Sequence, residues 1–148
     1  YAGNIHNIKF ILIDDNKIIN DISKWCQQNF ISDVHYIVAV TSGPTDLVRS
    51  YDSLGDRYSH QQAGAAIQQF LLKLIDLGLD GCWVGAFDEE RIKKILKIPE
   101  EVYLEAIIPI GYAMSGEKGK RKPSIDSVLR FNDYKQKTMS PKKEVGAF

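Results

Sequence analysis

Three short stretches of the chain carry groups that could bind a ligand. Residues 2–6 offer a carboxamide at Asn4 and an imidazole at His6, and residues 83–86 offer a flat indole beside backbone N–H groups. Residues 118–122, "KGKRK", offer cationic groups for an anion. Taken together, the three stretches suit a ligand that has a flat polar ring and a phosphate.

Each stretch also has a plainer explanation, which the residues alone leave open. Asn4 belongs to a type common in turns, Trp83 belongs to a type common in cores, and a basic run is commonly a solvated surface. The sequence contains neither a Gly-x-Gly-x-x-Gly after a strand nor a Gly-x-x-x-x-Gly-Lys-Ser/Thr. No Ser-His-Asp or Cys-His arrangement stands out either. A nucleotide would therefore have to bind without these fingerprints.

Composition narrows the class of protein. The chain of 148 residues is long enough for one domain with a sizeable core. Its 19 basic and 19 acidic residues cancel, which argues against nucleic acid and anionic membrane partners. The 2 cysteines and 3 histidines lack metal-ligand spacing, so no metal site is expected. Because no long apolar run or signal peptide is visible, we expect a cytoplasmic protein without a membrane span.

The first part of the chain predicts two strands separated by a helix. The β-branched run at residues 8–13 is typical of a strand, and Asp14-Asp15-Asn16 can cap the helix that follows. Apolar spacing predicts that this helix covers residues 17–30, and residues 35–40 predict the second strand. Residues 41–56 are rich in Gly, Pro and Asp, which predicts a long loop with one helical turn inside. Loops of this length are more often functional or in contact with a partner than passive.

The strongest helical pattern follows, over residues 59–77. Gly78 is expected to end this helix in a left-handed conformation. Small residues at positions 63–66 precede the large apolar ones. Such a start lets a helix pass closely under another backbone or a flat ligand, although ordinary helix–helix contact explains it equally well.

A short helix and a buried strand complete the pattern. Asp88 is a natural N-cap for a helix that reaches about Leu96. Residues 102–112 predict a buried strand, in which Pro109 indicates a sheet edge or a bulge. The polar tail from about residue 135 to 148 could wrap a partner subunit. The elements together indicate a mixed α+β fold.

The central part of the chain reads "AGAAIQQFLLKLIDLGLDGCWVGAFDEERIKKILKIPEEVYLEAIIPIGYA". This stretch resembles the FMN-dependent nitroreductase family, in which a long helix ends at Gly-Leu-Gly and is followed by Cys-Trp-Val/Ile-Gly and an Ile-Pro-Ile-Gly-Tyr strand. "AGNIHNIKFILI" is similar to the family's flavin-covering Pro-Ser-x-x-Asn-x-Gln-Pro-Trp-x-Phe segment. "KGKRKPSIDSVLRFN" is similar to its C-terminal Lys-x-Arg-x-Pro-Leu-Glu-Glu-Val motif. The resemblance covers the chain to about Tyr134.

The resemblance implies a mixed, mainly antiparallel sheet flanked by helices. It also implies a single domain over residues 1–148 and a homodimer with both flavins at the subunit interface. Family members begin with a helix and an Arg-Arg-Ser-x-Arg stretch that holds the FMN phosphate. Because this stretch has no counterpart in the sequence, we expect the N-terminal part of the family fold to be missing.

The resemblance also implies a flavin site. Its cofactor-binding residues would be Asn4, His6, Trp83, Val84, Gly85, Ala86, Lys120 and Arg121. Asn4 and His6 would contact the polar edge of the flavin, and residues 83–86 would line one face, with the N–H of Gly85 or Ala86 near N5. The cationic pair would reach the phosphate, with Lys118 as a looser candidate. No catalytic side chain is implied, because the flavin carries the chemistry.

The implied activity is a two-step flavin cycle. NAD(P)H would reduce FMN and leave, and an oxidised small molecule such as a nitroaromatic or a quinone would be reduced in its place. An alternative stays open: the chain is a flavin-poor, non-catalytic family member or fragment that acts as a binding or interaction module.

Overall fold

The computed structural model describes residues 1–112 and 122–139. The chain divides into two units, Tyr1–Ala113 and Met114–Phe148. The described part of the second unit contains one short helix, α5 (Ile125–Val128). All other elements belong to the first unit, and the expectation of a single domain stays a prediction.

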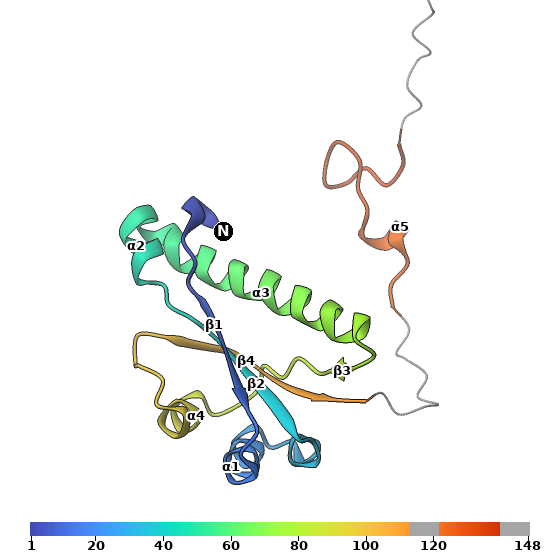
Figure 1. Ribbon diagram of the computed structural model, residues 1–148. Helices are drawn as coiled ribbons and strands as arrows, with labels where there is room; N and C mark the ends of the chain where they lie inside the picture. Colours follow the sequence, from blue (N-terminus) through green and yellow to red (C-terminus); the bar gives the residue numbers. More distant parts are fainter. Residues whose placement is uncertain (113–121, 140–148) are drawn as a thin grey trace, which may run out of the picture. The chain divides into compact units, whose positions relative to one another are not determined.

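A four-stranded sheet forms the centre of the first unit (Figure 1). Its order is β1-β2-β4-β3, and every neighbouring pair is antiparallel. The strands are β1 (Ile8–Ile13), β2 (Tyr36–Ser42), β4 (Tyr103–Gly111) and the two-residue β3 (Asp80–Gly81). The predicted mixed α+β fold with a mainly antiparallel sheet is confirmed.

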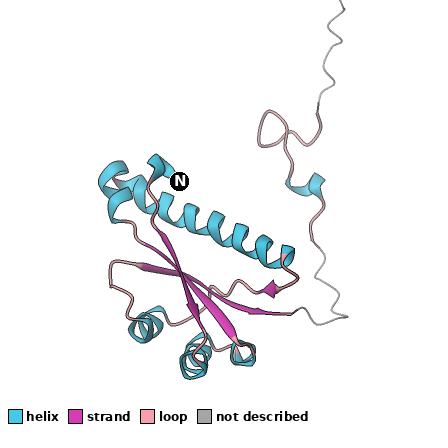
Figure 2. Ribbon diagram, in the orientation of Figure 1, coloured by secondary structure: helices cyan, strands magenta, loops and turns pink. Residues whose placement is uncertain are grey.

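Helices cover both faces of this sheet (Figure 2). The long helix α3 (Ser53–Asp76) crosses one face, and α1 (Asn16–Cys26) and α4 (Glu89–Leu96) lie on the other. Each face therefore has its own core. The buried core on the α3 side comprises Val38, Val40, Ile67, Leu74, Ala106 and Ile108. The core on the α1 and α4 side comprises Ile13, Ile19, Ile22, Cys26, Ile31, Ile37, Ala39, Val84, Ile92, Leu104 and Ile107.

Helix α1 starts where the sequence predicts and ends earlier. The Asp15 carboxylate accepts hydrogen bonds from the N–H groups of Lys17 and Ile18, at 2.8 and 3.0 Å, and so caps the helix. The helix ends at Cys26 because Gln27 adopts a left-handed conformation, with φ of 53°. The apolar spacing continues beyond this point into a 3₁₀ helix, η2 (Asn29–Asp33).

The prediction of a loop over residues 41–56 was wrong. Strand β2 runs to Ser42, helix α2 (Thr45–Tyr51) follows after Pro44, and α3 begins at Ser53. The glycine that suggested a loop serves packing instead: a Cβ on Gly55 would lie 2.3 Å from the carbonyl carbon of Leu47. Only a glycine lets α3 approach the backbone of α2 so closely.

The predicted end of α3 at Gly78 and the predicted start of α4 at Asp88 are both confirmed. Gly78 has a φ of 74°, and its N–H donates to Ile75 O at 3.0 Å, while the N–H of Leu79 donates to Leu74 O at 2.9 Å. This pair of bonds is the Schellman arrangement, which satisfies the last carbonyls of α3. Asp88 caps α4, because its carboxylate accepts a 3.1 Å hydrogen bond from Arg91 N.

Strand β4 lies inside the sheet and contains a bulge away from the proline. The register with β2 shifts between Val40, which pairs with Ala106, and Thr41, which pairs with Leu104, so Glu105 has no partner. The N–H and C=O of Ile107 pair with Val84 on the β3 side of β4. Backbone groups two residues apart on a strand point to the same side, so those of Pro109 also face the β3 side. That side is unpaired between Gly81 and Val84, so the missing N–H of the proline costs no ladder bond.

Candidate functional site

The opening segment is attached to α3 by a partly buried polar network. Asn7 Nδ2 donates to Ser59 Oγ at 2.7 Å, and Gln62 Nε2 donates to Asn7 Oδ1 at 2.6 Å. Gln62 Oε1 also accepts from the backbone N–H of Ala2. The Ser59 side chain is fully buried. These residues carry no local sequence signal, because the partners are more than fifty positions apart in the chain.

The network leaves Asn4 and His6 exposed on the outer surface of the segment. Asn4 has a φ of 57°, which asparagine tolerates better than most residues. The two side chains lie together, with 3.2 Å between His6 Nε2 and Asn4 Oδ1, and the His6 ring packs 4.3 Å from the ring of Tyr1. Asn4 is thus a turn residue, which agrees with its plainer explanation, and its side chain is exposed.

Residues 83–86 divide into a core residue and exposed groups. Val84 is buried, and its N–H and C=O both pair with Ile107 at 3.0 Å. Trp83 is half exposed, and a Cβ on Gly64 of α3 would lie 3.8 Å from its Cη2. Gly85 and Ala86 are exposed, and over residues 1–112 and 122–139 their N–H groups have no hydrogen-bond partner. These two amides are free to bind a ligand.

The opening segment and residues 83–86 lie at opposite edges of the sheet. Ile11, Ala39, Ile107 and Val84 are matched across it, so roughly 14 Å separates Ile11 from Val84 at a strand spacing of about 4.8 Å. His6 lies outside the sheet, two residues before the start of β1. Both segments also contact α3, Ala2 at Gln62 and Trp83 beside Gly64, and among the described residues no contact joins Asn4 or His6 to residues 83–86.

The third predicted group cannot be compared with the structure. Lys118, Lys120 and Arg121 lie outside the described residues. Lys122 is described and is exposed.

A second polar network connects the β4 bulge to α3. Glu105 accepts a hydrogen bond from Ser42 Oγ and lies 2.8 Å from His60 Nδ1. The His60 ring packs 4.8 Å from the ring of Tyr103, whose hydroxyl donates to Asp56 Oδ1 at 2.9 Å. This bond, with a smaller effect of burial, raises the pKa of Tyr103. The sequence gives no local signal for this network, because the bulge brings Glu105 to the α3 side.

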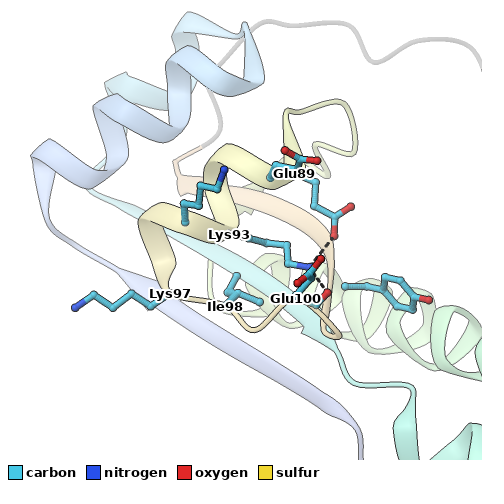
Figure 3. Close-up of a pocket in the computed structure, with 8 residues that line it drawn as sticks. Glu89, Lys93, Lys97, Ile98 and Glu100 are labelled. Atoms are coloured by element: carbon cyan, nitrogen blue, oxygen red, sulfur yellow. Dashed lines mark hydrogen bonds and ion pairs between the residues drawn. The ribbon is translucent and has the colours of Figure 1, made fainter.

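A charged hollow of about 730 Å³ lies beside α4 (Figure 3). Lys93 Nζ donates to Glu100 O at 2.7 Å and lies 3.8 Å from Glu89 Oε1. Glu89 Oε1 in turn accepts from Leu104 N at 3.0 Å. Lys93, Glu89 and the Glu100 carbonyl thus satisfy one another, and the lining also includes Glu90, Lys94 and Lys97, which form no ion pair within the described residues.

The described residues contain neither a metal-binding cluster nor a membrane-spanning helix. No group of three His, Cys, Asp or Glu side chains in this part of the chain could hold a metal ion. Among the same residues, each helix is too short or too polar to cross a bilayer.

Residues 1–112 match the family model described as "Nitroreductase family". A curated protein of Methanocaldococcus jannaschii, provisionally named a nitroreductase, is 33% identical over 85 residues, which are 57% of this chain and 42% of the relative. The chain therefore spans less than half the length of that relative.

Solved structures share the fold at low sequence identity. The NfrA1 nitroreductase of B. subtilis matches with a TM-score of 0.80 at 14% identity, over 90% of this chain and 60% of that one. The NADPH:FMN oxidoreductase of Vibrio harveyi, solved with NAD⁺, matches with a TM-score of 0.78 at 13% identity, over 90% and 62%. An FMN-dependent nitroreductase of Clostridium difficile matches with a TM-score of 0.70 at 21% identity, over 86% and 76%.

Proposed function

The chain belongs to the nitroreductase family, and from this premise we propose that it is part of an FMN-dependent oxidoreductase. The proposed reaction passes a hydride from NAD(P)H to an oxidised small molecule such as a nitroaromatic or a quinone. When bound, FMN supplies the electron carrier between donor and acceptor. The proposed location is the cytoplasm.

The free amides of Gly85 and Ala86 are the observation that carries this proposal. They follow Val84, whose pairing with Ile107 holds the start of the segment to the sheet. A backbone N–H held in this way is a directed donor for an acceptor atom such as the flavin N5. The half-exposed Trp83 next to them offers a flat apolar surface. These residues fit the edge and face of an isoalloxazine ring.

The opening segment fits the polar part of the same ring. Asn4 and His6 are exposed and offer amide, carbonyl and imidazole groups. The attachment of this segment to α3 through Asn7 fixes the backbone that carries them. Lys120 and Arg121 are proposed to contact the phosphate, where a guanidinium matches phosphate oxygens with two hydrogen bonds.

We further propose a homodimer in which each flavin lies between two subunits. The two groups of ligand-binding residues lie at opposite edges of one sheet. A two-fold axis would bring the opening segment of one chain next to residues 83–86 of the other, and the same operation would build the second site. A dimer therefore reconciles the positions of both groups with one flavin.

Absorbance spectroscopy of the purified protein tests the proposal. We expect a flavin spectrum, either at once or after addition of FMN, that bleaches with NADH or NADPH in the absence of oxygen and returns when a quinone is added. A protein that never binds FMN would contradict the proposal and favour the alternative of a non-catalytic interaction module. A protein that binds FMN and is not reduced by either donor would contradict the proposed donor alone.

A further inference from the structure

A smaller hollow of about 280 Å³ lies on the α4 side of the sheet, next to the opening segment. Its lining includes the half-buried side chains of Ile11 and Ile98 and the buried Thr41. Lys9 pairs with Thr41 across β1 and β2, so its side chain starts on the same face of the sheet. The hollow thus has an apolar lining on the surface of the sheet opposite to α3.

Two lysines from different elements reach this hollow. Lys9 comes from β1, and Lys97 comes from the end of α4. Figure 3 shows the side chain of Lys97 extending away from Glu89 and Glu100, two of the three acidic residues that line the larger hollow. Across the described ranges, neither Lys9 nor Lys97 forms an ion pair. Both charges are available to a ligand.

The one acidic residue in the lining has a cationic neighbour. Asp46 Oδ1 lies 3.2 Å from Arg49 Nη1. Lys9 and Lys97 have no ion-pair partner among the described residues, whereas the charge of Asp46 is offset by Arg49. The electrostatic field in the hollow is therefore positive.

We propose that this hollow binds a small aromatic carboxylate. The apolar lining favours a flat ring, and the two lysines favour an anionic group at its rim. The volume fits a single substituted ring rather than a nucleotide. An inorganic anion would use the lysines and leave the apolar lining without a partner.

This site goes beyond the proposed flavin site and does not need bound FMN. The two adjoin, because His6 also lines the hollow. A ligand here would therefore alter flavin affinity through His6 and through Asn7, which also lines the hollow and anchors the opening segment.

Calorimetric titration with benzoate and benzamide tests the proposal, because the two molecules have nearly the same shape and differ in charge. Exposed charge pairs each contribute modestly, so we expect benzoate to bind roughly 2- to 25-fold more tightly at low salt. Equal affinities would overturn the proposal. Inorganic phosphate that binds as tightly as benzoate would overturn the assignment of an aromatic ligand.

Charge variants locate the site. Lys9→Gln and Lys97→Gln should each weaken benzoate binding by roughly 1.5- to 5-fold and leave benzamide binding unchanged. Asp46→Asn should strengthen benzoate binding. Lys94→Gln is the matched control, because Lys94 lies on α4 and lines the larger hollow only. An equal loss in this control would show general attraction by surface charge and overturn the site.

Methyl NMR gives a readout that is independent of affinity. Benzoate should shift the methyl signals of Ile11 and Ile98 and leave those of the buried Ile92 in place. Shifts elsewhere would overturn the location. Repeating the titration with and without added FMN separates this proposal from the flavin proposal, since benzoate should bind even where FMN does not.

Discussion

At the scale of single residues, the proposed chemistry depends on the backbone N–H of Gly85. Proline at this position removes the N–H, and the extended conformation of the paired Val84 is the one that a residue before proline prefers. A Cβ on Gly85 meets only Trp83 Nε1, at 4.0 Å. We therefore expect Gly85→Pro to fold, to bind FMN, and to lose roughly 100-fold or more in the rate of flavin reduction by NAD(P)H, measured by stopped-flow absorbance.

Gly85→Ala is the control for this prediction, because it adds the same Cβ and keeps the N–H. Its rate of reduction should stay near that of the wild type. If Gly85→Pro were reduced as fast as Gly85→Ala, the amide would have no role in the reaction.

The two cysteines should differ in reactivity and in their effect on stability. Burial raises the pKa of Cys26 to about 11 from 9.0. The thiol in the folded state keeps its proton when the unfolded state has lost it, so the free energy of unfolding should fall between pH 9 and 11 by up to about 3 kcal/mol. Urea denaturation at several pH values measures this loss.

Cys26→Ala supplies the reference for that series. The titration of Tyr103, whose pKa is also raised, is common to both proteins and cancels in the difference. Parallel stability curves for the two proteins would contradict the assignment. In the same preparations a thiol reagent should label only the exposed Cys82 of the folded protein, and both cysteines in urea.

At the scale of elements, two glycines of α3 should respond to alanine in opposite directions. A Cβ on Gly55 would lie 2.3 Å from the backbone of Leu47 and Val48, so Gly55→Ala should lower the free energy of unfolding by about 3 kcal/mol. A Cβ on Gly64 would make an ordinary 3.8 Å contact with Trp83. Gly64→Ala should therefore raise stability by about 0.5–1 kcal/mol through helix propensity.

Urea denaturation of both variants checks this pair. Similar changes in the free energy of unfolding of both variants would show that the contact between α2 and α3 leaves room for a Cβ at Gly55.

The same elements show which parts of the fold can be predicted from sequence. The helix boundaries at Asp15, Gly78 and Asp88 rest on hydrogen bonds to neighbours within five positions, so their residue types were sufficient. Gly55 was misread because a glycine required for close helix packing looks like a loop glycine until the second helix is in place. The bulge at Glu105 depends on the register with β2 and has no local signal.

The candidate site divides in the same way. Trp83 and Gly85 are proposed as site residues through their motif, and the structure adds that the Val84 side chain belongs to the core. The bonds of Asn7 to Ser59 and Gln62 join residues 52 and 55 positions apart. A single sequence does not indicate such pairs, because only the packing of α3 on the sheet makes them neighbours.

At the scale of the whole molecule, the chain exposes large apolar side chains that a second copy could cover. They occur on β1 and on the outer face of α3, and include Phe10, Leu12, Leu72 and Ile75. We expect light scattering to give a dimer. A monomer that binds FMN tightly would contradict the shared site.

Mixing two defective variants tests whether each site uses both chains. Asn4→Ala/His6→Ala impairs one half of the site, and Gly85→Pro impairs the other. After unfolding and refolding of an equal mixture, half of the dimers should be mixed and should carry one intact site of two, which restores about a quarter of the wild-type activity. Each variant refolded alone is the control, and a mixture as inactive as the two controls would place the whole site within one chain.

The bulge in β4 also bears on how related sequences are compared. Ala106 belongs to the core on the α3 side and Leu104 to the opposite core, with the unpaired Glu105 between them. Deleting Glu105 would leave both neighbours on their present faces, whereas deleting Ile107 would turn one half of the strand over. A one-residue gap in an alignment at Glu105 therefore removes the acceptor of Ser42 and His60 but keeps the flanking residues on their faces. Relatives that lack this residue should still match this chain position for position on either side.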